Sequence, residues 1–275
     1  MGKKMAEWVK LPELPEKPRK SGKIEVRVPY YASVATVTYI KDVLEAWSEY
    51  FDGFKFACGT FRLLDKSMVK KIIGLCHDHD VYVSTGGWVE RVLVDGKKAV
   101  DRYFDECKEV GFDVIEISSG FARMTLEDKV AMIKRVKEIG LTPKPEITMM
   151  YGAGAGTHIV GYKRELRPIG EFMEEAKACW DAGKSTMMLE SEGLTEDLPP
   201  EQWKKDVIKK VVGKFGYEKW MFEASDPEVF KWYLKNFGPK VNLFIDHTQI
   251  TEFNAWRLKL WGDPDIWKGK SVKYR

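Results

Sequence analysis

Short apolar runs, each containing or ending in a polar residue, recur along most of this chain and constrain its fold more than any other feature. The runs are Phe54-Lys55-Phe56, Val81-Tyr82-Val83-Ser84, Val114-Ile115-Glu116-Ile117, Pro145-Glu146-Ile147, Met187-Met188-Leu189-Glu190, Trp220-Met221-Phe222-Glu223 and Val241-Asn242-Leu243-Phe244-Ile245-Asp246. Most are followed by Gly, Ser or Thr and then by a helical pattern. Strands that alternate with helices predict a parallel sheet, and in a (β/α)8 barrel the C-terminal strand ends line the active site. The series therefore predicts the mouth of such a barrel.

The length of 275 residues suits one barrel of this kind, for which about 250 residues are ordinary. We expect an α/β fold with a single (β/α)8 TIM barrel over residues 23–275 and an extended N-terminal arm over residues 1–22. The arm contains Leu11-Pro12-Glu13-Leu14-Pro15-Glu16-Lys17-Pro18, and proline fixes φ and removes a hydrogen-bond donor. Such a segment can be loose or lie along the barrel or a neighbouring subunit.

Composition excludes several classes of protein. The net charge of +3 comes from 45 basic and 42 acidic residues, and no basic face with interleaved aromatics predicts nucleic-acid binding. The four cysteines lie far apart, so neither a zinc site nor a disulfide framework is predicted, and a reducing cytoplasm fits best. No run reaches the roughly 18 apolar residues that span a membrane, and the first 20 residues do not resemble a signal peptide.

The apolar periodicity predicts eight strand and helix units. Strands are expected over residues 24–28, 53–56, 81–83, 114–117, 142–148, 186–189, 220–222 and 241–245. Helices are expected over residues 34–50, 65–78, 98–110, 126–139, 169–182, 203–215 and 249–260, with one more that begins at Asp226-Pro227. Thr125 has the spacing of an N-cap for the helix that follows it. One long irregular piece covers residues 150–168.

Four glutamates, Glu116, Glu146, Glu190 and Glu223, are expected side by side at the mouths of strands four to seven. Converging carboxylates repel and raise one another's pKa, so a divalent cation is the expected partner, with Mg²⁺ ahead of zinc for oxygen ligands. Alternatively, one or two of them point outward and pair with a helix cation. At the end of the last strand, Asp246 and His247 could form a metal-binding or proton-transfer pair. Alternatively, neighbouring residues satisfy His247.

The expected mouth also contains groups that suit an anion. Lys55 can bind phosphate or carboxylate or act as an acid, or it can pair structurally with Glu223 or Asp246. The segments Gly86-Gly87 and Ser118-Ser119-Gly120 expose backbone N–H groups near helix starts, although tight βα turns would show the same pattern.

The glycine-rich stretch over residues 151–158 is interpreted as a lid with glycine hinges. On closing, Lys163, Arg164 or Arg167 could bring a cation to the mouth.

Several of these segments, taken in order, resemble one family. They are Lys55-Phe56-Ala57-Cys58-Gly59-Thr60, Ser84-Thr85-Gly86-Gly87, Gly111-Phe112-Asp113-Val114-Ile115-Glu116-Ile117-Ser118-Ser119-Gly120, Met221-Phe222-Glu223-Ala224 and Val241-Asn242-Leu243. Together they resemble the phosphosulfolactate synthase family, and the run from Val241 to Gln249 is similar to its branch with plant heat-stress-associated proteins. The resemblance implies a barrel, often a homo-oligomer, that adds sulfite to phosphoenolpyruvate with Mg²⁺ on the way to coenzyme M.

The resemblance and the strand-end positions together give the predicted site. Catalytic roles are expected for Lys55, Glu146 and Glu223. Substrate contacts are expected for Gly86, Gly87, Ser118, Ser119, Asn242 and His247, and metal ligation for Glu116, Glu146, Glu190 and Asp246.

The chain departs from the family pattern at two places. The methanogen enzymes carry Glu-Val-Gly-Lys-Lys where this chain has Glu146-Ile147-Thr148-Met149-Met150, and Pro29-Tyr30-Tyr31 replaces Asp-Lys-Gly. Lys55 is then expected to be the principal cation of the site. The alternative function is a non-catalytic, stress-associated protein that keeps the barrel and acts by binding other proteins.

Overall fold

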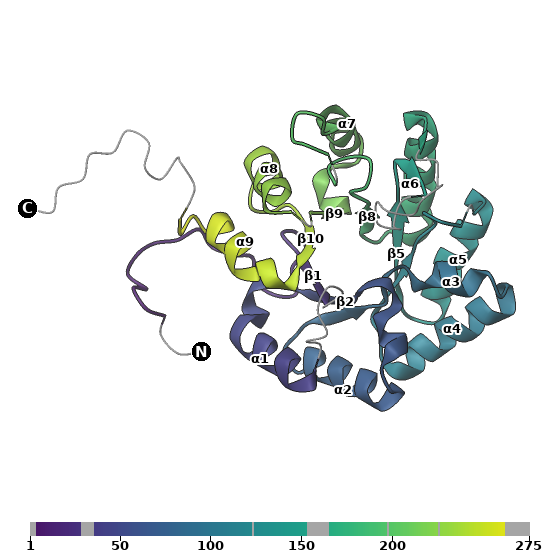
Figure 1. The fold of residues 1–275 in the computed structure, drawn as a ribbon, viewed down its shortest axis with the longest axis horizontal. Helices are drawn as coiled ribbons and strands as arrows, with labels where there is room; N and C mark the ends of the chain where they lie inside the picture. Colours follow the sequence, from purple (N-terminus) through teal and green to yellow (C-terminus); the bar gives the residue numbers. More distant parts are fainter. Residues whose placement is uncertain are drawn as a thin grey trace, which may run out of the picture.

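Eight parallel strands close into a barrel surrounded by helices (Figure 1). The computed structural model describes residues 4–28, 36–122, 124–152, 165–196, 198–224 and 226–261. Around the barrel the strand order is β1-β2-β3-β4-β5-β8-β9-β10, and β10 pairs with β1 to close it. The strands are β1 (Ile24–Val28), β2 (Gly53–Phe56), β3 (Tyr82–Ser84), β4 (Val114–Ile117), β5 (Thr142–Ile147), β8 (Met187–Leu189), β9 (Trp220–Glu223) and β10 (Leu243–Asp246). The predicted (β/α)8 class is confirmed.

Helices cover the outside of the barrel (Figure 1). They are α1 (Val37–Trp47), α2 (Lys66–His77), α3 (Val89–Leu93), α4 (Lys97–Val110), α5 (Leu126–Glu138), α6 (Ile169–Gly183), α7 (Lys205–Phe215), α8 (Pro227–Phe237) and α9 (Ile250–Arg257). Local sequence explains several starts. Thr125 caps α5 by accepting from the Asp128 N–H at 3.1 Å, and Pro227 occupies the first turn of α8, where its missing N–H is harmless.

Two pieces of secondary structure were missed by the sequence pattern. The short helix α3 lies in the connection after β3, and Met150–Tyr151 (β6) pairs antiparallel with Glu165–Leu166 (β7) inside the piece expected to be irregular. Both are too short to show a period in the sequence. The segments 29–35 and 153–164, which include the predicted lid cations Lys163 and Arg164, lie outside the described residues.

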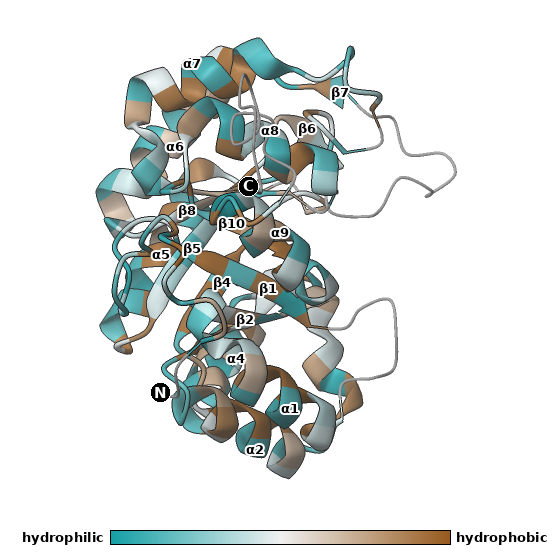
Figure 2. Ribbon diagram, turned by 90° about the vertical axis from the view of Figure 1, so that its left-hand side faces the viewer, coloured by the Kyte–Doolittle hydropathy of each residue, from teal (hydrophilic) through white to brown (hydrophobic). Residues whose placement is uncertain are grey.

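The strands are buried on both faces, as in other parallel sheets. Figure 2, coloured by hydropathy, shows both hydrophobic and hydrophilic residues along the barrel strands. Ile24, Val26 and Val28 of β1 belong to the large apolar core that includes residues of the surrounding helices. Met188, Met221 and Phe244 form a separate small cluster contributed by three neighbouring strands, β8, β9 and β10. The alternate positions Glu25 and Arg27 of β1 are buried and charged. Alternation along the strands therefore separates an apolar layer beneath the helices from a charged barrel interior.

The described part of the N-terminal arm, from residue 4 to residue 20, contains no helix or strand. Arg19 fixes its end to the barrel, because its guanidinium pairs with the buried Asp52 at 2.9 Å and donates to the Glu49 carbonyl at 2.7 Å. Within the described ranges, no helix combines the length and apolar character needed to cross a membrane.

Asn242 lies just before β10, at the opposite end of the strands from the expected mouth. Its side chain accepts from the Lys23 N–H at 2.9 Å and donates to the carbonyls of Trp220 at 2.9 Å and Glu218 at 3.2 Å. These bonds join the chain before β1 to the start of β9. The structure therefore places the predicted substrate contact Asn242 away from the mouth, where its amide is engaged in holding strand starts together.

The variant Asn242→Ala would leave these buried backbone groups without partners. We expect its free energy of unfolding to fall by about 2–3 kcal/mol, measured by urea denaturation. The control Asn236→Ala removes an exposed amide with one hydrogen bond, to the Trp232 carbonyl at 2.8 Å. It should cost less than about 0.5 kcal/mol, and equal losses in the two variants would contradict the interpretation.

Candidate functional site

A cavity of about 390 Å³ opens at the C-terminal ends of the barrel strands. Seven glutamates line it: Glu90, Glu116, Glu146, Glu190, Glu192, Glu196 and Glu223. The lining cations are Arg27, Lys55 and Arg91. The cavity is therefore strongly acidic unless some of these carboxyl groups are protonated or a cation binds.

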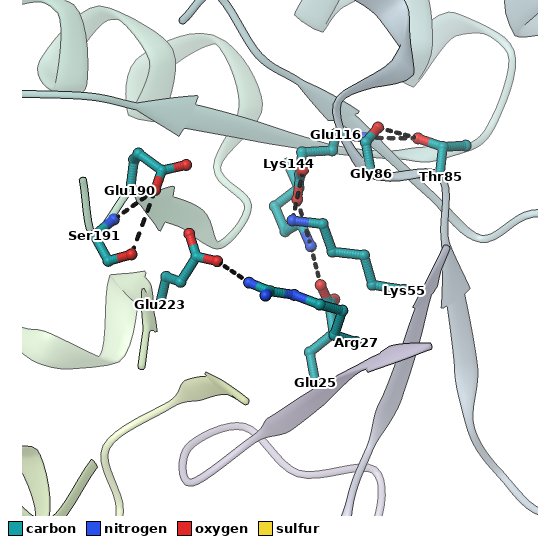
Figure 3. A network of polar contacts seen from close by, with 10 residues as sticks. All are labelled: Glu25, Arg27, Lys55, Thr85, Gly86, Glu116, Lys144, Glu190, Ser191 and Glu223. Carbon is teal, nitrogen blue, oxygen red and sulfur yellow. Dashed lines mark hydrogen bonds and ion pairs between the residues drawn. The ribbon is translucent and has the colours of Figure 1, made fainter. Parts of the chain in front are cut away.

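A chain of buried ion pairs crosses the barrel beneath the cavity (Figure 3). Lys55 Nζ lies 2.7 Å from Glu116 Oε1, and Lys144 Nζ lies 3.0 Å from Glu116 Oε2. Lys144 also pairs with Glu25 on the far side of the barrel. Burial alone would raise the pKa of Glu116, but Lys144 and Lys55 lower it below its ordinary value, so this carboxylate is ionised.

A second ion pair joins Arg27 of β1 to Glu223 of β9 (Figure 3). The ring of Phe244 lies beneath both cations, with Lys55 Nζ at 4.1 Å and the Arg27 guanidinium carbon at 5.0 Å from its centroid. Burial opposes ionisation of Glu223, but Arg27 and Lys55 lower its pKa. The Lys55 ammonium is thus held between Glu116 and an aromatic face at the cavity wall.

Three carboxylates converge on the other side of the cavity. One oxygen from each of Glu190, Glu196 and Glu223 lies within 4.8 Å of the others, an arrangement that can hold a metal ion. Burial and then the charges of Glu223 and Glu146 raise the pKa of Glu190 well above its ordinary value. Burial and Glu223 raise the pKa of Glu196 to about 7. The donor set is entirely oxygen, which fits a hard divalent cation such as Mg²⁺.

Glu146, at the end of β5, lines the same cavity. Burial and the neighbouring Glu116 charge raise its pKa to about 8, and Lys55 offsets this only in part. Its carboxyl group is therefore protonated at neutral pH, next to an ionised Glu116. Two carboxyl groups with opposite protonation states are the arrangement from which acid and base roles are assigned.

Gly87 and Ser118, two of the predicted substrate contacts, line the cavity. A Cβ on Gly87 would lie 2.7 Å from Ser118 Oγ, so glycine leaves room for this hydroxyl. Gly86 does not line the cavity. Its φ is +62°, and a Cβ there would lie 2.5 Å from the Phe56 carbonyl oxygen, so glycine is needed for the close approach of two βα turns.

Ser119 faces a second cavity, of about 740 Å³, that lies beside the first. Its hydroxyl accepts from the buried Lys129 Nζ at 2.9 Å. Lys129 also donates to the Glu146 carbonyl and pairs with Glu175 at 2.6 Å. The predicted substrate contact at Ser119 is therefore not made in the central cavity, because Lys129 holds this side chain on the outer side of the strand ends.

Asp246 and His247 lie outside the lining of the central cavity. Asp246 Oδ1 accepts from the Thr248 N–H at 2.9 Å and from its hydroxyl at 2.6 Å, and lies 3.2 Å from His247 Nδ1. The His247 ring packs edge-on against Tyr39, with centroids 5.7 Å apart. The structure therefore places the predicted metal ligand Asp246 and the predicted substrate contact His247 away from the central cavity, because Thr248 caps the carboxylate and Tyr39 packs against the imidazole.

Glu116 also departs from its predicted role as a metal ligand. Both of its oxygens face ammonium groups, Lys55 on one side and Lys144 on the other. Of the predicted metal ligands, only Glu190 belongs to the convergent group, where Glu196 and Glu223 join it.

Comparisons with known proteins identify the family of this chain. The family model described as (2R)-phospho-3-sulfolactate synthase (ComA) matches residues 12–263. The chain belongs to this family. It is 34% identical over 254 residues to Protein HEAT-STRESS-ASSOCIATED 32 of Arabidopsis thaliana, with 88% of each chain covered. It is 26% identical over 239 residues to the phosphosulfolactate synthase of Methanocaldococcus jannaschii, covering 82% of this chain and 88% of that one. The family and branch predicted from the sequence are confirmed.

Solved structures show the same fold at low identity. A putative fructose-1,6-bisphosphate aldolase from Coccidioides immitis superposes with a TM-score of 0.57 at 13% identity, covering 88% of this chain and 90% of that one. An N-acetylneuraminate lyase from Mycoplasma synoviae gives a TM-score of 0.53 at 12% identity, covering 92% and 78%. These likenesses concern the barrel alone.

In this member of the family the strand-five methionines are buried outside the cavity lining. Met149 belongs to the apolar core, and Met150 pairs with Leu166 in the β6–β7 hairpin. Arg167, which the sequence offered as a replacement cation, pairs with Glu175 at 2.6 Å and lines the second cavity. Neither position supplies a cation to the central cavity.

The cations that sequence reasoning missed are Arg27 and Lys144, so Lys55 is not the principal cation by itself. A signal for them exists, because side chains two residues apart point to the same face of a strand. Lys144 stands two residues before Glu146 on β5, and Arg27 stands two residues after Glu25 on β1, one residue before that strand ends. Sequence reasoning also missed the carboxylate Glu196. No strand period could have indicated it, since it lies in an irregular connection after β8.

The opposite pKa shifts of Glu146 and Glu116 predict opposite effects of glutamine substitution, measured by urea unfolding in EDTA. A raised pKa means that the native state binds the extra proton, so stability from Glu146 is complete at low pH and is lost as pH rises. Relative to Glu146→Gln, the wild type should lose up to about 1.4 kcal/mol per pH unit between pH 5 and pH 8.

For Glu116, whose pKa is lowered, the sign reverses. Glu116→Gln should be less stable than the wild type at pH 7, and the deficit should shrink as pH falls below the ordinary range of a glutamate. A difference between wild type and Glu146→Gln that stays constant from pH 5 to pH 8 would contradict the assigned protonation.

Proposed function

We propose that this chain is a Mg²⁺-dependent lyase or synthase that adds a nucleophile such as sulfite to phosphoenolpyruvate or a related small anionic substrate. The observation that carries the proposal is that one cavity contains both the buried Lys55 ammonium and the three convergent carboxylates, Glu190, Glu196 and Glu223. Membership of the phosphosulfolactate synthase family supports the reaction class.

Charge explains how a bound cation would strengthen the binding of an anionic substrate. Even when Glu146 and Glu190 are protonated, the other five carboxyl groups outnumber the three cationic side chains that line the cavity, so a phosphorylated carboxylate would meet net repulsion. Glu190, Glu196 and Glu223 would hold the divalent ion. When bound, such an ion supplies Lewis-acid stabilisation of negative charge that develops on a carboxylate.

The protein's own groups fit the rest of the addition. The new C–S bond forms at the terminal alkene carbon, and the displaced electron pair moves toward the substrate carboxylate as an enediolate. Lys55 offers a positive charge to that group, in a cavity where electrostatic interactions are strong. Protonation of the neighbouring carbon then completes the addition, and the protonated Glu146 is the group proposed to deliver that proton.

Glu146 in this role offers a reason why the strand-five lysines can be absent. An acid at the end of β5 is kept, but it is a carboxyl group whose proton is retained by burial and by Glu116. Arg27 and Phe244 position Lys55 and Glu223 from neighbouring strands.

Direct assay tests the reaction. Purified protein with Mg²⁺, sulfite and phosphoenolpyruvate should form phosphosulfolactate, detected by ³¹P NMR. Lys55→Met and Glu146→Gln should each lower the rate by about 10²- to 10⁴-fold. The control Glu127→Gln changes an exposed carboxylate in the first turn of α5 and should keep the wild-type rate.

Mg²⁺ alone gives a separate measurement. It should raise the thermal midpoint of the wild type, and Glu223→Gln should reduce that rise. No product, under conditions in which a lysine-bearing relative turns over, would reject sulfite addition.

The second candidate is a non-catalytic, stress-associated protein, favoured by the 34% identity to Protein HEAT-STRESS-ASSOCIATED 32. The absence of both product and any stabilisation by divalent cations would favour this candidate over the enzyme.

A further inference from the structure

The carboxylate of Glu90, on α3, lies in a ring of backbone donors from the loop after β4. Glu90 Oε1 accepts from the Gly120 N–H at 3.0 Å, and Oε2 accepts from the N–H groups of Phe121 at 2.7 Å and Ala122 at 2.8 Å. Three consecutive N–H groups that converge on one anion form a nest, an arrangement that binds phosphate in many proteins. Here a side chain of the protein itself occupies the nest.

The nest lies at the wall between two cavities. Phe121 lines both the central cavity and the larger second cavity, while Glu90 lines the first and Gly120 the second. A ligand in the central cavity can therefore reach the position of the Glu90 carboxylate without passing through the barrel wall.

A second polar group, the Ser118 hydroxyl, belongs to the lining of the same cavity. Ser118 lies two residues before Gly120, is 2% exposed and lines this cavity. Its hydroxyl has no hydrogen-bond partner among the residues that the structure describes. A buried hydroxyl in this situation is a donor and acceptor available to a ligand.

The charges around the nest favour an anion that is stronger than a carboxylate. Burial raises the pKa of Glu90, and the three N–H groups and the charge of Lys129 lower it only in part. The carboxylate is thus incompletely compensated where it lies. A phosphoryl group has three acceptor oxygens and more charge, and so can use the nest and the Ser118 hydroxyl together.

We propose that the Gly120–Ala122 nest, with Ser118, is a subsite for the phosphoryl group of the ligand, and that the ligand displaces the Glu90 carboxylate from it. The inference rests on the proposed function in one respect, since it locates the phosphate of that substrate. Displacement also moves one negative charge away from the bound anion. Glu90 therefore acts as an internal competitor that selects for ligands carrying phosphate.

The test measures inorganic phosphate alone, with neither metal nor substrate present. A tethered carboxylate competes at an effective concentration in the millimolar range, so its removal should tighten phosphate binding by about tenfold or more. Isothermal titration should show this gain for Glu90→Ala over the wild type. The matched control Glu127→Ala removes an exposed carboxylate from the first turn of α5, seven residues from Gly120, and should bind phosphate as the wild type does.

Amide NMR supplies the location. In Glu90→Ala, phosphate should shift the amide signals of Gly120, Phe121 and Ala122, and the additional variant Ser118→Ala should weaken the binding. Equal phosphate affinity in Glu90→Ala, Glu127→Ala and the wild type would overturn the proposal. In that case Glu90 would be a structural latch between α3 and the loop.

A variant that keeps the shape of Glu90 guards against misfolding. Glu90→Gln retains the packing and loses the charge, so it should also bind phosphate more tightly than the wild type, though by a smaller factor. No gain in this folded variant would equally overturn the proposal. A gain in phosphate binding without sulfite addition would reject the proposed reaction and keep the subsite, and the converse result would do the opposite.

Discussion

The structure depends on the burial of charge inside a closed barrel. Glu25, Lys144, Glu116 and Lys55 come from β1, β5, β4 and β2, and each has an oppositely charged partner within the interior. Removing one member of such a set leaves an uncompensated buried charge, which costs about 3–5 kcal/mol. A barrel filled by aliphatic side chains would tolerate small changes of strand position. This one needs the four strands at the right distance for ammonium and carboxylate to meet.

The same requirement organises the mouth above it. Lys55 and Lys144 neutralise the negative charge of Glu116, and Arg27 partly neutralises that of Glu223. Among the contacts of the described residues, Glu190 and Glu196 have no equivalent cation. Burial and the charge of Glu223 raise the pKa values of both groups, and no nearby cation fully offsets this. The cavity thus has a side in which charges are balanced and a side in which protons or a metal must supply the balance. Substrate chemistry is proposed at the border between these two sides.

The sequence predicted the barrel well because strand and helix periods are local. It placed all eight barrel strands and the strand-end positions of Lys55, Glu146 and Glu223. It could not predict that Lys144 meets Glu25, because those residues are 119 positions apart and touch only when the barrel closes. For Asp246 a local contact matters instead. It stands at a strand end, yet Thr248 donates to its carboxylate, which becomes a cap and does not line the cavity. The position of a residue in a strand fixes its backbone, and the nearest hydrogen-bond donors decide which way its side chain points.

The ring of Phe244 gives the site a property beyond shape. Lys55 and Arg27 lie over the same aromatic ring although their carboxylate partners, Glu116 and Glu223, belong to different sides of the cavity. Two like charges that share one polarisable face do not respond independently. A ligand that draws Lys55 toward itself changes the field at Arg27 and so at Glu223, one of the three convergent carboxylates. Binding of an anion beside Lys55 and of a cation at the convergent carboxylates would therefore be thermodynamically linked, by the direct effect of Lys55 on Glu223 and by a ring that carries no charge at all.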